Sequence, residues 1–93
     1  MTLNPDFKSF LALNEALVKK ADDDDKLLIA VITHIIAAKL DDMDPTDAYY
    51  DFLNCSGYKS SSEMFQIYTG LQDDGTLIET YNGIRKRCSN VPN

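Results

Sequence analysis

The hydrophobic pattern of the chain is dominated by one segment, residues 26–40, which is apolar on every side. A helix that is hydrophobic all round has to be buried by its neighbours. Aspartates 22–25 precede this segment and further acids follow it, so that eight of the fifteen acidic residues flank one stretch. We therefore expect a small domain packed around a central helix, with both charged ends of that helix in water.

A second helical pattern covers residues 5–20. Asn4 can cap this helix and Pro5 fits its first position. The two lysines at its end suit the negative pole of the helix dipole, and aspartates 22–25 suit the positive pole of the central helix. The run of four aspartates is therefore predicted to mark a junction between two helices.

Two shorter amphipathic helices are predicted in the middle of the chain. One covers residues 45–54, with Asp44 as its N-cap and Pro45 at its first position. The other covers residues 61–70 and follows a capping box of three serines and a glutamate. The apolar stripe predicted for this second helix consists of Met64, Phe65, Tyr68 and Leu71.

Residues 76–88 allow two interpretations. Asn82-Gly83 lies between two β-prone runs, which is the strongest short signal for a β-hairpin. A capping box at residues 76–79 would instead open a final helix, which must carry the glycine in its interior at a cost of about 1 kcal/mol. We favour the hairpin because of this turn chemistry, followed by a short tail over residues 89–93.

The predicted fold is therefore mainly α, a single domain over residues 1–93 with about four helices and a C-terminal hairpin. Helices that precede a two-stranded wing are the layout of winged-helix domains. The stretch from residue 71 to 79 is similar to the way such domains leave their recognition helix and enter the wing. This resemblance covers residues 27–88, consists of a spacing and a few generic residues, and includes no motif that defines a family. The alternative is an all-α bundle of five helices.

The negative charge is concentrated in the first part of the chain. Residues 1–54 hold eleven acids and five lysines, which accounts for the whole net charge of −6, and residues 55–93 are neutral. Negative charge opposes attraction to the phosphates of nucleic acid or to an anionic membrane. It suits a partner with a basic surface.

Neither a membrane span nor a disulfide framework is predicted. The longest apolar run, residues 27–38, is shorter than the ~20 residues that a membrane-crossing helix needs. Cys55 and Cys88 lie outside any CxxC spacing, and two reduced thiols are typical of a cytoplasmic protein. We expect a cytoplasmic protein that does not associate with membranes.

No pattern of catalytic or metal-binding residues stands out. A calcium loop starting at Asp42 would need glycine at its sixth position and glutamate at its twelfth, where the chain has Asp47 and Leu53. The single histidine, His34, lies inside the most apolar helix, where a core or boundary position is usual. Glycine-rich loops of the kind that hold phosphate are missing as well. We therefore expect a protein that is not an enzyme and uses neither a metal nor a cofactor.

Nucleic-acid binding is the main alternative function. In a winged-helix layout, the helix over residues 61–70 would enter the major groove and the wing would lie near phosphates. That helix carries no basic side chain, which weakens this hypothesis. The residues that it assigns to nucleic acid are Ser61, Ser62, Gln66, Arg85, Lys86 and Arg87.

Aromatic residues beside acids favour binding to another protein. Tyr49 and Tyr50 are adjacent on a helix and cannot point the same way, so we expect Tyr49 to face inward and Tyr50 to be exposed. We predict an adaptor or inhibitor that binds and regulates a partner with a basic surface. A more specific version of this hypothesis is that the acidic surface imitates the charge of DNA. If part of the central helix is exposed, that exposure would favour a homodimer. The predicted contact residues are Asp41, Asp42, Asp44, Asp47, Tyr50 and Asp51.

Overall fold

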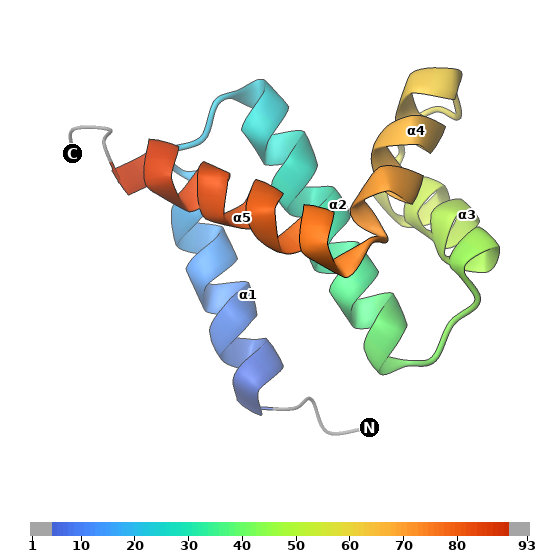
Figure 1. Ribbon diagram of the computed structural model, residues 1–93, viewed down its shortest axis with the longest axis horizontal. Coiled ribbons are helices and arrows are strands. Elements are labelled where there is room, and N and C mark those ends of the chain that lie inside the picture. Colours follow the sequence, from blue (N-terminus) through green and yellow to red (C-terminus); the bar gives the residue numbers. More distant parts are fainter. Residues whose placement is uncertain (1–4, 90–93) are drawn as a thin grey trace.

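Five helices make up the part of the chain that the structure describes, residues 5–89 of a computed structural model (Figure 1). They are α1 (Pro5–Val18), α2 (Asp23–Leu40), α3 (Pro45–Ser56), α4 (Ser62–Leu71) and α5 (Asp74–Ser89). A mainly α fold is therefore confirmed, in the all-helical form that the sequence left as the alternative. The predicted cap Asn4 and most of the predicted tail, residues 90–93, lie outside the described residues.

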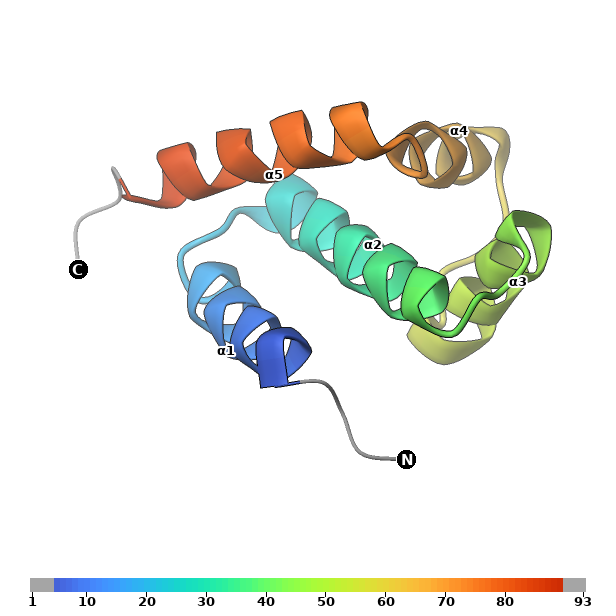
Figure 2. The same ribbon diagram turned by 60° about the horizontal axis from the view of Figure 1, so that its bottom comes forward.

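The central helix α2 packs against each of the other four helices (Figures 1 and 2). Every residue from 27 to 38 is buried or half-buried, as expected for a helix that is apolar all round. The middle of the core consists of Val31, Ile32 and Ile35. The helices around α2 therefore serve mainly to cover it.

Short polar side chains cap the helices close to where the sequence places them. Asp22 accepts a hydrogen bond from the backbone N–H of Asp25 at 2.8 Å, so the aspartate run does mark the junction of α1 and α2. Ser61 accepts one from the N–H of Met64 at 3.0 Å and begins α4. At the end of α3, Gly57 has a φ of +79°, a left-handed conformation that glycine adopts without strain.

The predicted β-hairpin over residues 76–88 is wrong, because these residues belong to α5. Apolar side chains at helical spacing form one face of α5, and a strand would send alternate residues to opposite sides and break this face. No strand is present in the part of the chain that the structure describes. The side chains that share the face and lie buried or half-buried are Leu77, Tyr81, Ile84 and Cys88.

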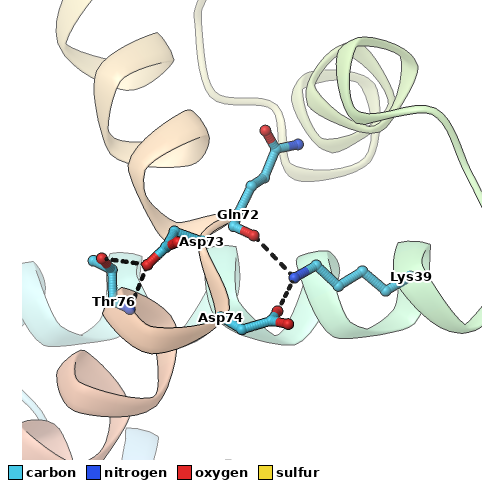
Figure 3. A network of polar contacts seen from close by, with 5 residues as sticks. All are labelled: Lys39, Gln72, Asp73, Asp74 and Thr76. Atoms are coloured by element: carbon cyan, nitrogen blue, oxygen red, sulfur yellow. Dashed lines mark hydrogen bonds and ion pairs between the residues drawn. The ribbon is translucent and has the colours of Figure 1, made fainter.

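The start of α5 is set by Asp73 and not by the capping box that the alternative interpretation places at residues 76–79. One carboxylate oxygen of Asp73 accepts hydrogen bonds from the backbone N–H and the hydroxyl of Thr76, at 3.0 and 2.9 Å (Figure 3). The backbone hydrogen bond, followed by the hydroxyl, lowers the pKa of Asp73. A negative charge at this end also suits the dipole of α5.

Ion pairs join α5 to α2 near both ends, and the two helices run in roughly opposite directions (Figures 1 and 2). Near the start of α5, the ammonium group of Lys39 contacts the Asp74 carboxylate and donates to the carbonyl of Gln72 at 2.9 Å (Figure 3). Near its end, the guanidinium of Arg87 donates two hydrogen bonds to Asp25, at 2.8 and 3.0 Å. The two contacts together fix the register of α5 along α2.

A buried polar contact joins α1 to both α2 and α5. The side-chain amide of Asn14 donates to the hydroxyl of Thr33 at 2.7 Å, and its carbonyl accepts from the hydroxyl of Tyr81. Burial raises the pKa of Tyr81, with the nearby Arg85 acting in the opposite direction. Asn14 thus orients α1, and the thiol of Cys88 adds a second polar contact by donating to the carbonyl of Leu17 at 3.8 Å.

Replacing Gly83 with alanine is expected to raise the free energy of unfolding by roughly 0.5–1 kcal/mol, because alanine loses less backbone freedom in a helix. An added Cβ would have its nearest contact, at 3.4 Å, with the flexible end of the Arg87 side chain. Chemical denaturation followed by circular dichroism measures the change. In the tight turn of a hairpin the same glycine would have a positive φ, so a loss of stability would contradict the helix.

The matched control for this substitution is Gly57→Ala. Gly57 has a positive φ, and alanine there is strained although nothing lies within 4 Å of an added Cβ. We therefore expect the two glycine-to-alanine changes to shift stability in opposite directions.

Candidate functional site

The first two predicted acidic residues form the turn that leaves α2. Asp41 donates its backbone N–H to the carbonyls of Ala37 and Ala38, both at 3.2 Å, and so closes the helix. Asp42 follows with a φ of +54°, a conformation that aspartate adopts more readily than most residues. Both side chains are exposed. They therefore add negative charge at the surface beside the start of α3.

Asp44 and Asp47 form the first turn of α3. The Asp44 carboxylate accepts hydrogen bonds from the backbone N–H groups of Thr46 and Asp47, at 3.1 and 3.4 Å, and Pro45 occupies the first helical position. Asp47 is exposed and its carboxylate makes no ion pair in the described part of the chain. Asp44 therefore supports the helix, whereas Asp47 is available to a partner.

Tyr49 and Tyr50 point in different directions, as predicted. Tyr49 is buried, and its ring contacts the rings of Tyr50 and Phe65, with centroid distances of 5.4 and 5.3 Å. Tyr50 remains 57% exposed, and Phe65 remains 47% exposed. Two large aromatic side chains from different helices thus remain partly exposed, and each contacts the same buried ring.

Phe65 is the residue of this region that sequence reasoning placed incorrectly. It was expected in the apolar stripe of the helix over residues 61–70, but the core accepts Met64, Tyr68 and Leu71 and leaves Phe65 at the surface. Met64, Tyr68 and Leu71 are separated by four and three residues, which is the spacing of a single helix face, and Phe65 lies beside that face. This spacing was the signal that could have identified Phe65 as exposed.

Helical spacing also places Asp47, Tyr50 and Asp51 on one side of α3. We use the name acidic–aromatic surface for Asp41, Asp42, Asp44, Asp47, Tyr50, Asp51 and Phe65. It covers the turn between α2 and α3, the outer side of α3 and one exposed ring of α4. The predicted protein-contact residues thus lie along one turn and the helix that follows it, and Phe65 contacts that helix through the ring of Tyr49.

One member of this surface, Asp51, is tied to the core through His34. The imidazole Nε2 lies 2.8 Å from a carboxylate oxygen of Asp51, and Nδ1 lies 2.7 Å from the hydroxyl of Tyr68. The thiol of Cys55 also donates to Asp51, at 3.8 Å. The chain of contacts therefore joins α2, α3 and α4 and ends at the surface.

A single neutral tautomer of His34 satisfies every group in this chain of contacts. A carboxylate can only accept, so Nε2 donates to Asp51, and Nδ1 then accepts from the hydroxyl of Tyr68. Burial, followed by the negative charge of Asp51, raises the pKa of Tyr68 to about 12 and keeps its hydroxyl as a donor. Both ring nitrogens are engaged, which makes His34 a connector between helices.

The residues assigned to nucleic acid in the alternative hypothesis are not brought together. Ser61 caps α4, and Ser62 and Gln66 are exposed on that helix. The basic run at residues 85–87 lies at the far end of α5 from α4 (Figures 1 and 2). The wing that should carry these basic residues beside the recognition helix is replaced by α5.

Arg87 is also engaged inside the molecule. Its two hydrogen bonds to Asp25, which is only 6% exposed, raise the pKa of the guanidinium. Arg85 and Lys86 are exposed and make no ion pair among residues 7–89. Only two of the three predicted basic residues are thus free to meet phosphate.

The abundant acids do not converge on one point. Among the residues that the structure describes, no group of three or more His, Cys, Asp or Glu side chains is placed to hold a metal ion. Within the same residues, no helix is both long enough and apolar enough to cross a membrane.

Comparison with protein-family models, with curated proteins and with solved structures finds no match to this chain. The case for a function therefore rests on the geometry and charge of the molecule itself.

Proposed function

We propose that this chain is a small non-catalytic protein that binds another protein and regulates it. The contact is made by the acidic–aromatic surface, and the partner presents a basic surface. Opposite charge speeds the encounter and fixes orientation, whereas buried aromatic side chains supply most of the affinity. The acidic–aromatic surface offers both kinds of group.

The observation that supports this proposal most strongly is the exposure of Tyr50 and Phe65 beside Tyr49. Exposed aromatic surface costs free energy in water, and aromatic residues are enriched in protein interfaces. Five aspartates accompany them in the acidic–aromatic surface, and the net charge of the chain is −6. A partner that covers the two rings would also place its cations against these carboxylates.

The described residues do not form the features that the nucleic-acid alternative requires. It required a wing next to the helix over residues 61–70, and it required the basic run of residues 85–87 on that wing. In their place are α5 and the contact between Arg87 and Asp25. No observation favours this second function over protein binding.

Replacing both Tyr50 and Phe65 with serine is expected to weaken partner binding roughly thirtyfold, because loss of an aromatic hot spot costs about 2 kcal/mol or more. Wild-type protein on a support first captures the partner from cell lysate. The affinity of the purified partner for each variant is then measured by titration calorimetry. We expect a basic partner whose affinity falls as salt is raised.

Two further variants make this experiment specific. Ile78→Ser removes an equally exposed apolar side chain, 57% exposed, from α5 and should leave binding unchanged. Asp42→Asn together with Asp47→Asn removes two charges while Asp44 still caps α3, and should reduce the dependence on salt. Equal loss of binding in the serine double variant and in Ile78→Ser would contradict the proposed surface. Chemical-shift changes on addition of duplex DNA, confined to α4 and residues 85–87, would instead support nucleic-acid binding.

A further inference from the structure

A groove of about 490 Å³ lies between α1 and α2, outside the acidic–aromatic surface. Its apolar walls come from Leu11 and Val18 of α1 and from Ile29 of α2. Leu11 and Val18 are separated by two helical turns and remain half-buried, so this side of the α1–α2 pair presents apolar surface, and no other helix of residues 5–89 lines it.

The polar groups in the floor of this groove already have partners within the molecule. The amide of Asn14 donates to Thr33 and its carbonyl accepts from Tyr81. The Thr33 hydroxyl in turn donates to the backbone carbonyl of Ile29 at 2.7 Å. An occupant therefore finds few unsatisfied hydrogen-bonding groups in the floor, and an apolar surface fits it best.

The rim of the groove carries two opposite charges. Glu15 and Lys19 lie one turn apart on α1, both are exposed, and neither makes an ion pair in the described part of the chain. A basic protein would be matched by an acidic rim, whereas this rim is neutral overall. A rim with one charge of each sign is complementary to a rotated copy of itself.

We propose that a second copy of this chain docks in the groove between α1 and α2 and forms a two-fold symmetric dimer. In such an interface the same patch on each subunit meets itself. Parallel α1 helices would bring Glu15 against Glu15 of the partner subunit. Antiparallel α1 helices instead bring Glu15 against Lys19 of the partner subunit, and the reverse contact follows by symmetry. The apolar walls of the two grooves are then covered together.

This inference does not rest on the proposed binding of a basic protein. The groove is lined by residues of α1 and α2, and none of them belongs to the acidic–aromatic surface. The dimer therefore leaves that surface free for another partner.

The symmetry of the two contacts allows a charge-exchange experiment by analytical ultracentrifugation. We expect wild-type protein to dimerise, and Glu15→Lys or Lys19→Glu each to weaken self-association at least about tenfold, because each places like charges together. A mixture of the two single variants should form heterodimers, because a chain with two lysines then faces a chain with two glutamates. The variant that carries both exchanges should dimerise with itself again.

Controls separate this geometry from a general effect of charge. Glu79→Lys on α5 changes the net charge by the same amount as Glu15→Lys and should leave the dimer intact, since Glu79 is exposed outside the groove. Circular dichroism should report an unchanged fold in each variant, because both rim side chains are exposed. A monomeric wild type would overturn the proposal. So would a dimer that neither single exchange weakens, or single variants that do not associate when mixed.

Discussion

Tyr68→Ala is expected to lower the free energy of unfolding by about 3–5 kcal/mol, because a large buried aromatic ring is removed and a cavity is left. Tyr68 is 0% exposed, and its ring lies against those of Tyr49, Phe52 and His34 at centroid distances of 5.6, 5.5 and 5.8 Å respectively. A domain is stable by only roughly 0.1 kcal/mol per residue, so this is a large share of the total. Chemical denaturation followed by circular dichroism measures it. Tyr50→Ala, which removes an exposed ring, should change stability by no more than about 0.5 kcal/mol.

Tyr68→Phe serves as the second control, because it keeps the ring and removes only the hydroxyl. Loss of the donor to His34 should cost about 1–2 kcal/mol at neutral pH. The pKa of Tyr68 is raised from its ordinary value of 10.0 to about 12 in the folded protein. The stabilisation from the protonated hydroxyl is therefore complete below pH 10, where tyrosine in the unfolded chain is also protonated, and is lost as the pH rises to about 12. Wild-type protein should lose more stability than Tyr68→Phe over this interval, and an equal loss would contradict the raised pKa.

The local parts of the fold could be predicted from the sequence because their signals lie within a few residues. Asp44 and Pro45 begin α3 where the pattern places them, and the aspartates at residues 22–25 open α2. A helix cap depends on a side chain and a backbone N–H two or three residues away, so spacing alone identifies it. The same is true of the central helix, whose continuous apolar stretch requires burial on all sides.

The incorrect prediction of a hairpin at α5 arose because the local turn signal disagrees with the packing of the core. Asn82-Gly83 favours a tight turn when only its neighbours are considered. The apolar face that contains Tyr81 and Ile84 is satisfied only by a helix against α2, and its burial outweighs a cost of about 1 kcal/mol for glycine in a helix. Tertiary packing therefore determines the helical structure of α5, and local turn signals alone do not predict that packing.

The polar contacts that join one helix to another could also not be predicted from local patterns. His34 is separated from Asp51 by 17 residues and from Tyr68 by 34, and Asp25 is separated from Arg87 by 62. These pairs exist because α3, α4 and α5 fold back onto α2. The acids and Tyr50 of the acidic–aromatic surface could be proposed from the sequence because they are close together in it, whereas Phe65 lies on the next helix and contacts Tyr49.

Ile84→Ala is expected to lower the free energy of unfolding by about 2–5 kcal/mol, because Ile84 is 0% exposed on the side of α5 that packs against the core. Ile78→Ala on the same helix should change it by no more than about 0.5 kcal/mol, since that side chain is 57% exposed. The two substitutions remove the same atoms and differ only in the face of α5 on which they lie. Chemical denaturation of both variants therefore measures how much the packing of α5 contributes to stability. Equal effects of the two substitutions would mean that α5 does not present this face to the core.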